Sequence, residues 1–259
     1  MASRAAAGGA VPAAWWSTYF DAGYLREYAP LFDEAADRAQ VARVLELLAL
    51  PARARVLDLA CGQGRHARLL AEGGLRVDGV DLSTPLLAIA ARGIGNRPVR
   101  YTRADMRRLP ARWSGRFDGV VNLFTSFGFF DEPADDATVI REVARVLRPG
   151  GRFLWQGGSR DGVLANFVAR DAWTTAGGMH VAQEREFDPV TGFLEIRSTW
   201  TRGRRVERRA HRIRLYTADH LADLIRAAGL TVEAVYDGFT DRPLTRRSGE
   251  MLLVARAAD

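Results

Sequence analysis

The sequence predicts an α/β fold: a doubly wound, mostly parallel, seven-stranded sheet of the Rossmann-like type, with N-terminal helices and an inserted antiparallel β meander. Two observations predict the parallel part. Short apolar runs bounded by turn residues alternate with amphipathic helical patterns between residues 54 and 157, as expected for strands covered by helices on both faces. The first run also ends in a glycine-rich turn. A third observation predicts the meander, because polarity alternates along most of 179–215.

The N-terminal region is predicted to be helical after a short leader. Residues 1–14 are expected to be a disordered leader, since they hold one arginine and no long apolar run. Aromatic residues crowd 15–28 in an amphipathic pattern, and 34–49 carries a broad apolar helical face that Pro51 ends. We therefore expect residues 15–50 to form a helical lid.

Residues 51–160 are predicted to form a cofactor-binding core. A buried parallel strand is short, apolar and bounded by turn residues. The runs that fit this description are 54–60, 75–81, 98–105, 116–124 and 151–157. The intervening helices are predicted at 63–73, at 84–92 with Ser83 as the N-cap, and at 134–147.

Residues 161–215 are predicted to form the inserted meander, which we expect to shape the substrate site. Its three strands are 179–187, 193–201 and 205–215. Residues 216–259 are expected to complete the core sheet with a helix capped by Thr217 and two strands, 230–237 and 250–257.

Composition narrows the class of protein. The net charge is +6, and all of the basic residues are arginine, as in proteins from GC-rich bacterial genomes. Arginines alternate along Arg202–Arg214, which favours a solvated strand face over a nucleic-acid patch. The single cysteine, Cys61, excludes an intrachain disulfide and a cysteine metal cluster. No run of eighteen apolar residues occurs, so we expect a cytoplasmic bacterial protein that binds neither membrane nor nucleic acid.

A glycine-rich turn carries the strongest local signal. In VLDLACGQGRHA (56–67), a strand runs into Gly62 and Gly64 and then into a helix, so the backbone can approach a ligand closely. Asp81 ends the next strand, where a carboxylate can accept hydrogen bonds from both ribose hydroxyls. Together with Ala67, the glycines also satisfy the G-x-G-x-x-G/A fingerprint of dinucleotide-binding proteins. The turn alone therefore predicts a nucleoside-bearing cofactor without deciding which one.

Two acidic positions favour a methionine-bearing cofactor over a dinucleotide. Asp58 lies four residues before Gly62, where its charge repels a pyrophosphate and attracts an ammonium group. Asp105 and Met106 end the third strand, where the carboxylate can accept from an adenine amino group and the thioether can cover the ring.

These motifs resemble those of the class I S-adenosylmethionine-dependent methyltransferases, of the bacterial small-molecule type. DLACGQG resembles motif I, with Ala60 in place of the usual first glycine, and Asp81, Asp105-Met106 and the LRPGG turn (147–151) resemble later motifs. The resemblance implies S-adenosylmethionine as methyl donor, S-adenosylhomocysteine as product, and no metal. The predicted cofactor-binding residues are Asp58, Ala60, Gly62, Gly64, Arg65, Asp81, Leu82, Asp105, Met106, Asn122, Leu123 and Tyr19.

The acceptor site is predicted at the carboxyl ends of the strands. The candidate substrate contacts are Phe20, Phe124, Phe127 and Phe130, although ordinary core packing suits the same residues. His180 is the preferred general base, because it follows Gly177-Gly178 at the start of the meander. Such a base is needed only when the nucleophile arrives protonated.

The sequence thus predicts methyl transfer from S-adenosylmethionine to N or O of a small-molecule metabolite, by a monomer or a homodimer. Three alternatives stay open: an NAD(P)-dependent oxidoreductase, a nucleic-acid methyltransferase, and a fold relative with another reaction. Against the second, Asn122-Leu123-Phe124-Thr125 stands where a nucleic-acid enzyme would carry (N/D)PP(Y/F).

Overall fold

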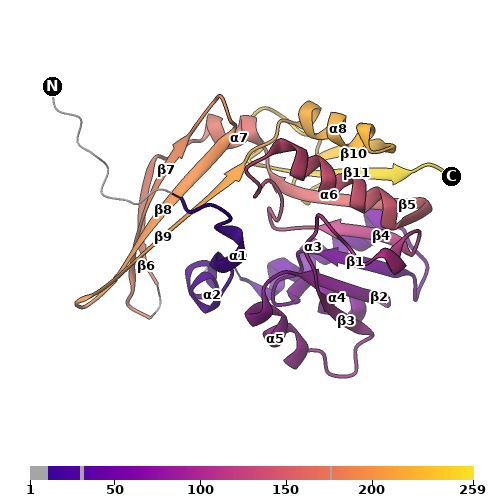
Figure 1. The fold of residues 1–259 in the computed structure, drawn as a ribbon, viewed down its shortest axis with the longest axis horizontal. Coiled ribbons are helices and arrows are strands. Elements are labelled where there is room, and N and C mark those ends of the chain that lie inside the picture. The colour runs from indigo at the N-terminus through magenta and orange to yellow at the C-terminus, as the bar shows by residue number, and fades with distance from the viewer. Residues whose placement is uncertain (1–10, 30–31, 176) are drawn as a thin grey trace.

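The computed structural model describes residues 11–29, 32–175 and 177–259. They form a seven-stranded and a four-stranded sheet (Figure 1). The larger sheet has the order β10-β11-β5-β4-β1-β2-β3. Its strands are β1 Arg55–Leu59, β2 Arg76–Asp81, β3 Val99–Arg103, β4 Phe117–Asn122, β5 Leu147–Gly158, β10 Leu230–Asp237 and β11 Glu250–Ala257.

Strand β11 pairs antiparallel with both β10 and β5, and the pairs from β5 to β3 are all parallel. The predicted doubly wound fold is thereby confirmed. The LRPGG turn was expected to precede β5, but it lies inside this strand. The register of β5 against β4 shifts there, between Phe117 and Gly119.

Helices cover both faces of the larger sheet, because its strands are apolar on both sides. Along β1, Val56 joins the core cluster under the helices of residues 34–48 and 65–72, whereas Leu57 and Leu59 join the cluster under the helices of residues 133–146 and 218–227. Each face is thus filled by alternate residues of the same strand. The helices are α3 Glu34–Leu48, α4 Arg65–Glu72, α5 Thr84–Arg92, α6 Pro133–Val146 and α8 Ala218–Ala227, with a 3-10 turn η2 at Ala111–Trp113.

The N-terminal aromatic segment forms two short helices rather than the single helix predicted over 15–28. These are α1, Trp16–Tyr19, and α2, Ala22–Tyr28. The break occurs because the Asp21 side chain accepts a hydrogen bond from the Tyr24 backbone N–H and so starts a new helix. Most of the predicted leader, residues 1–10, lies outside the described residues.

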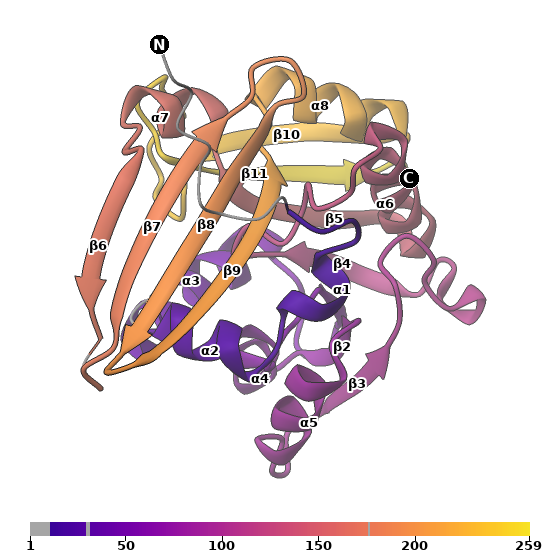
Figure 2. The same cartoon turned by 60° about the vertical axis from the view of Figure 1, so that its left-hand side comes forward.

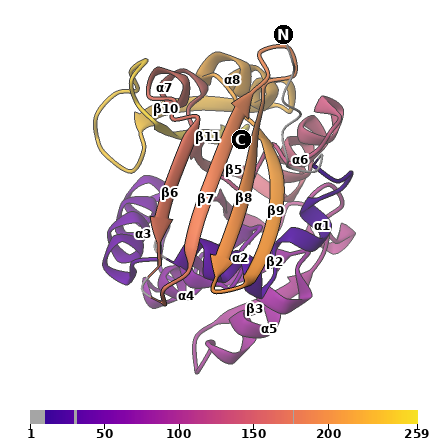
Figure 3. The same cartoon turned by 90° about the vertical axis from the view of Figure 1, so that its left-hand side faces the viewer.

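The predicted meander is present as β7 His180–Phe187, β8 Phe193–Arg202 and β9 Arg205–Arg214. A fourth strand, β6 Arg170–Thr174, and a helix, α7 Arg160–Ala165, were not predicted. Strand β6 escaped prediction because it is five residues long, mostly exposed and without clear alternation. Figure 1 shows this sheet beside the larger one, with α1 and α2 between the two, and Figures 2 and 3 turn its four strands toward the viewer.

The expectation that the arginines of β9 form a solvated strand face is wrong in part. They do not form a single solvated face, because Arg209 and Arg214 point inward. Arg214 is 7% exposed and pairs with the buried Asp136 of α6 at 3.3 Å. Arg209 pairs with Asp21 at 2.8 Å and so connects β9 to the N-terminal helices.

The described residues contain no helix that combines the length and hydropathy needed to cross a membrane.

Candidate active site

A cavity opens at the carboxyl ends of β1 to β4, beneath α1 and α2. Its volume is about 890 Å³, a figure that includes the open space at its mouth. The strands of the larger sheet, with the loops and helices that follow them, contribute Asp58, Ala60, Cys61, Gly62, Gln63, Arg65, His66, Val80, Asp81, Leu82, Leu86, Ala104, Asp105, Met106, Leu123, Phe124, Ser126, Phe129 and Phe130. The N-terminal segment contributes Trp16, Phe20, Tyr24 and Phe32.

The turn after β1 has a left-handed backbone at three positions. Ala60, Gly62 and Gly64 have φ angles of 58°, 54° and 74°. A Cβ on Gly64 would collide with the Tyr101 hydroxyl, whereas a Cβ on Gly62 would meet only a Leu86 methyl at 3.7 Å. Gly62 therefore borders open cavity space, as a residue passed closely by a ligand should. Ala60 holds a conformation that usually requires glycine.

Asp81, at the end of β2, organises this turn. Its Oδ2 accepts a hydrogen bond from the Gly62 N–H at 2.8 Å, and its Oδ1 accepts one from the Ser83 N–H at 2.7 Å. Burial raises the pKa of the Asp81 carboxyl above its usual range. The carboxylate thus faces the cavity from a position fixed by two backbone donors.

Asp58, inside the end of β1, is a buried carboxyl group with unused hydrogen-bonding capacity. It is 2% exposed, and its Oδ2 has no hydrogen-bond partner among the described residues. Burial, followed by the charge of Asp81, raises its pKa to about 7, while Arg65 acts in the opposite direction. A cation that reached this carboxyl group would restore its ionised form.

Arg65, at the start of α4, places a guanidinium cation in the same cavity as the Asp58 carboxyl group. Its Nη1 forms an ion pair with Asp37 of α3, and its guanidinium lies 4.1 Å from the ring centre of Phe124 and 5.3 Å from that of Phe32. Its buried Nη2 has no hydrogen-bond partner among the described residues. Arg65 and Asp58 therefore offer one free donor and one free acceptor, a pair that suits an amino acid zwitterion.

At the other end of the cavity, the Asp105 carboxylate already accepts hydrogen bonds from Arg107. Arg107 donates to both of its carboxylate oxygens, at 2.7 Å to Oδ2 and 3.1 Å to Oδ1. The Arg107 guanidinium also lies 4.3 Å from the ring centre of Phe130 and 5.0 Å from that of Trp16. Met106 lines the cavity beside this cluster.

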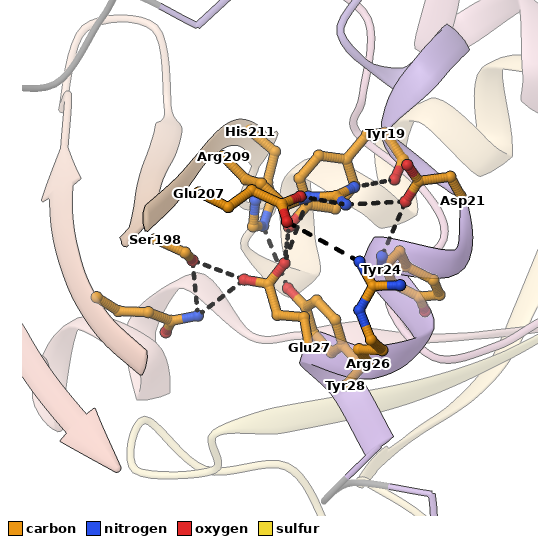
Figure 4. A network of polar contacts seen from close by, with 11 residues as sticks. Tyr19, Asp21, Tyr24, Arg26, Glu27, Tyr28, Ser198, Glu207, Arg209 and His211 are labelled. Carbon is orange, nitrogen blue, oxygen red and sulfur yellow. Dashed lines mark hydrogen bonds and ion pairs between the residues drawn. The ribbon is translucent and has the colours of Figure 1, made fainter. Parts of the chain in front are cut away.

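The N-terminal helices line the cavity through Trp16, Phe20 and Tyr24 and are anchored on the far side by Glu27. The Ser83 hydroxyl donates to the Phe20 carbonyl at 2.6 Å. Glu27, 3% exposed, accepts hydrogen bonds from the Tyr19 hydroxyl at 2.7 Å and from the Ser198 hydroxyl at 2.6 Å (Figure 4). Tyr19 therefore faces the meander, and Phe20 and Tyr24 line the cavity instead.

Most of the predicted site residues line this one cavity, and five do not: Tyr19, Gly64, Asn122, Phe127 and His180. The Asn122 amide is fully buried and donates to the Leu59 and Ser126 carbonyls. Phe127 packs in the core against Trp155 and Tyr216.

His180 lies at the exposed start of β7, where its ring nitrogen contacts the Thr174 hydroxyl at 2.8 Å. It is outside the cavity lining, so its position does not support the role of general base. Phe32 and Ser126 line the cavity without having been predicted. Phe32 lies between α2 and α3, and no sequence motif marks it.

Comparison with known proteins decides which family this geometry represents. Residues 56–151 match the family described as "Methyltransferase domain". The chain is also 31% identical over 242 residues to the dTDP-3-amino-3,6-dideoxy-alpha-D-glucopyranose N,N-dimethyltransferase of Streptomyces fradiae, a match that spans 86% of this chain and 91% of that protein. The chain belongs to the class I S-adenosylmethionine-dependent methyltransferases. It is therefore a methyltransferase enzyme, as the sequence motifs predicted.

Solved structures agree with this assignment at the level of the fold. The CcbJ methyltransferase from Streptomyces caelestis superposes with a TM-score of 0.80 at 22% identity, over 94% of this chain and 99% of that chain. The sugar N-methyltransferase KedS8 from Streptoalloteichus superposes with a TM-score of 0.63 at 25% identity, over 100% and 98%. Several other curated relatives match over only about half of their own length, 53% and 56% in two cases.

The cavity fits the cofactor of this family. S-Adenosylmethionine carries an ammonium and a carboxylate at one end, and the free atoms of Asp58 and Arg65 have the opposite charges. The open space beside Gly62 leaves room for the chain between them and the ribose. Among the described residues, no group of three or more histidine, cysteine, aspartate or glutamate side chains is arranged to hold a metal ion.

Proposed function

We propose that this enzyme transfers the methyl group of S-adenosylmethionine to the amine of a small-molecule acceptor, and that an amino-deoxysugar is the first acceptor class to test. One observation carries the proposal. The cavity wall on the side of β4 and the lid is aromatic, formed by Phe20, Tyr24, Phe124 and Phe129, and none of these side chains is a general base. An amine that arrives neutral needs no such base.

The donor is proposed to lie along the carboxyl ends of the strands, with its amino acid end at β1, its ribose at β2 and its adenine after β3. Asp58 would accept hydrogen bonds from its ammonium group, and Arg65 would donate to its carboxylate. Asp81 would accept from the ribose hydroxyls. Asp105 and Met106 would frame the adenine. The unpartnered atoms of Asp58 and Arg65 support this direction, because they mark the charged end beside Leu123 and Phe124.

When bound, the donor supplies an electrophilic methyl group on a positively charged sulfur. The residues of this chain would then align the acceptor nitrogen behind the methyl carbon and exclude water. The acceptor nitrogen would form its bond to the methyl carbon as the carbon–sulfur bond breaks, and the resulting ammonium would lose its proton to bulk water after the product leaves. Aromatic faces such as those of Phe124 and Phe129 would stabilise the positive charge, which is on the sulfur before the transfer and on the nitrogen after it.

Two titratable groups of the cavity lining, His66 and Tyr24, are unsuited to proton abstraction. Burial, followed by the charge of Arg65, holds the pKa of His66 well below its usual value. His66 also contacts the Gln40 side chain at 3.3 Å. Burial raises the pKa of the Tyr24 hydroxyl above its usual value, so that it remains protonated. Neither His66 nor Tyr24 would therefore be an effective base for the proton of an acceptor hydroxyl.

Two relatives support the acceptor class. The Streptomyces fradiae enzyme is named for an N,N-dimethylation of a nucleotide-linked amino sugar, and its match spans nearly the whole of both chains. KedS8 is described as a sugar N-methyltransferase. Both names refer to a nitrogen acceptor on a sugar.

The test is a comparison of matched acceptors. Nucleotide-linked 3-amino-deoxysugars and their 3-hydroxy counterparts are incubated with the enzyme and S-adenosylmethionine, and product mass and S-adenosylhomocysteine release are measured. We expect turnover with the amine only, and none with the Asp58→Asn variant as the donor-site control. Equal turnover of the hydroxy sugars, or turnover of neither class while the donor still binds, would contradict the proposal.

A further inference from the structure

The segment that follows β4 contains two consecutive residues with an unusual backbone. Phe124 and Thr125 have φ angles of 57° and 56°. Left-handed conformations are uncommon in residues other than glycine and are least favourable for β-branched residues such as threonine. Such a pair persists only when the surrounding structure holds it in place. The β4 loop, here defined as residues 123–126, is therefore a strained part of the cavity wall.

A single residue of the neighbouring strand holds both amides of this pair. The Gln156 side-chain Oε1 accepts a hydrogen bond from the Phe124 N–H at 2.6 Å, and the Gln156 backbone carbonyl accepts one from the Thr125 N–H at 3.2 Å. Gln156 is 4% exposed and lies near the carboxyl end of β5, which pairs with β4. Gln156 thus contacts the two strained residues without lining the cavity.

The side-chain amide of Gln156 is itself oriented by a second residue. Its Nε2 donates to Glu250 Oε2 at 3.0 Å, at the start of β11. A carboxylate accepts only from the nitrogen side of an amide, so the amide oxygen is directed at the Phe124 N–H. Glu250, Gln156 and the β4 loop therefore form a chain of hydrogen bonds across three elements.

The chain ends in the donor-binding cavity. The Phe124 ring lines the cavity, and the Arg65 guanidinium lies 4.1 Å from its centre. We infer that Gln156 is a positioning residue for the amino acid end of the methyl donor: it fixes the backbone of Phe124, whose ring fixes Arg65. This inference rests on the proposed placement of the donor, and it concerns binding of the donor rather than the choice of acceptor.

A variant that keeps the size of the side chain but removes its oxygen tests the inference. Gln156→Met is titrated with S-adenosylmethionine and with 5′-methylthioadenosine, which lacks the amino acid group. We expect about a tenfold loss of affinity for S-adenosylmethionine, as for one buried hydrogen bond of about 1.4 kcal/mol. The affinity for 5′-methylthioadenosine should change less than about twofold. A purely structural role of Gln156 would move both affinities together.

Two further variants complete the experiment. Leu154→Met, at a buried position two residues earlier on the same strand, controls for a general disturbance of β5 and should leave both affinities unchanged. Gln156→Glu combined with Glu250→Gln exchanges donor and acceptor while keeping an oxygen that faces the Phe124 N–H, and should restore most of the lost affinity. Amide hydrogen exchange over 123–126 should be faster in Gln156→Met than in the parent, with no ligand present.

The outcomes separate the inference from the function on which it rests. Unchanged affinity of Gln156→Met for S-adenosylmethionine, or equal losses for both ligands, would overturn the positioning role. A parent enzyme that binds both ligands equally would instead contradict the placement of the donor. Neither result depends on an acceptor, so failure of the acceptor proposal leaves this experiment unaffected.

Discussion

Raising the pH from 5.5 to 7.0 should strengthen the binding of S-adenosylmethionine about 16-fold, because Asp58 must be ionised to hold an ammonium group. With a pKa of about 7, the ionised fraction of Asp58 is about 0.03 at pH 5.5 and about 0.5 at pH 7.0. The apparent affinity is reduced by the fraction of the protein that is competent to bind. This pH range lies below the usual pKa of an α-amino group, about 7.7 to 8.0, so the ligand remains an ammonium throughout.

The Asp58 carboxyl group also makes the free energy of unfolding depend on pH. Its pKa is raised in the folded protein from 3.8 to about 7, so the unliganded folded state holds an additional proton between these values. Its contribution to stability is therefore present at low pH and is lost as the pH rises through about 7. Donor binding reverses the loss, and the increase in melting temperature caused by the donor should grow with pH.

Titration calorimetry measures these quantities directly. Binding at pH 6 should release close to one proton, seen as a dependence of the heat on the ionisation enthalpy of the buffer. The affinity of 5′-methylthioadenosine should vary little with pH, and the Asp58→Asn variant should lose the slope. An affinity for S-adenosylmethionine that stays constant from pH 5.5 to 7.0, or a slope that survives in Asp58→Asn, would refute the reasoning.

Three substitutions give further expected outcomes. Asp81→Ala should weaken S-adenosylmethionine binding by about 100-fold or more, because about 1.5 kcal/mol or more is lost for each hydrogen bond to a charged group; a dissociation constant within twofold of the parent would contradict its role. Ala60→Gly should raise the free energy of unfolding by about 1 kcal/mol, since Ala60 has a φ of 58°, and urea denaturation that shows no gain would argue against stored strain. Glu27→Ala should lower the free energy of unfolding by about 3 kcal/mol, because it leaves buried donors such as the Ser198 hydroxyl without their acceptor, and a midpoint equal to that of the parent would exclude a stabilising role for this contact.

The proposed donor half of the candidate site was largely predictable from the sequence, because its residues follow directly from local patterns. Asp58 and Asp81 end apolar strands, and parallel strands bring their carboxyl ends to one edge of a sheet. Local spacing was therefore enough to bring these carboxylates to the same cavity, where Gly62 also lies.

The acceptor half depends on long-range contacts that no local pattern encodes. Tyr19 and Phe20 are neighbours in the sequence, yet the first faces Glu27 and the second faces the cavity, because the helix breaks at Asp21. Phe124 and Phe127 follow the same strand, yet a left-handed backbone at Phe124 separates their directions. The aromatic pattern predicted three rings that line the cavity, Phe20, Phe124 and Phe130, but it could not separate them from Phe127, which packs in the core.

The buried Glu27 contact has a consequence for engineering this enzyme. The hydrogen bond between Glu27 and Ser198 joins positions 171 residues apart, and Arg209 adds an ion pair with Asp21 across the same boundary. The N-terminal helices and the meander therefore behave as one exchangeable module, although they are far apart in the chain. A chimera that imports the meander of a relative without its N-terminal helices would bury an unmatched glutamate, whereas exchange of both segments together keeps the pairing intact.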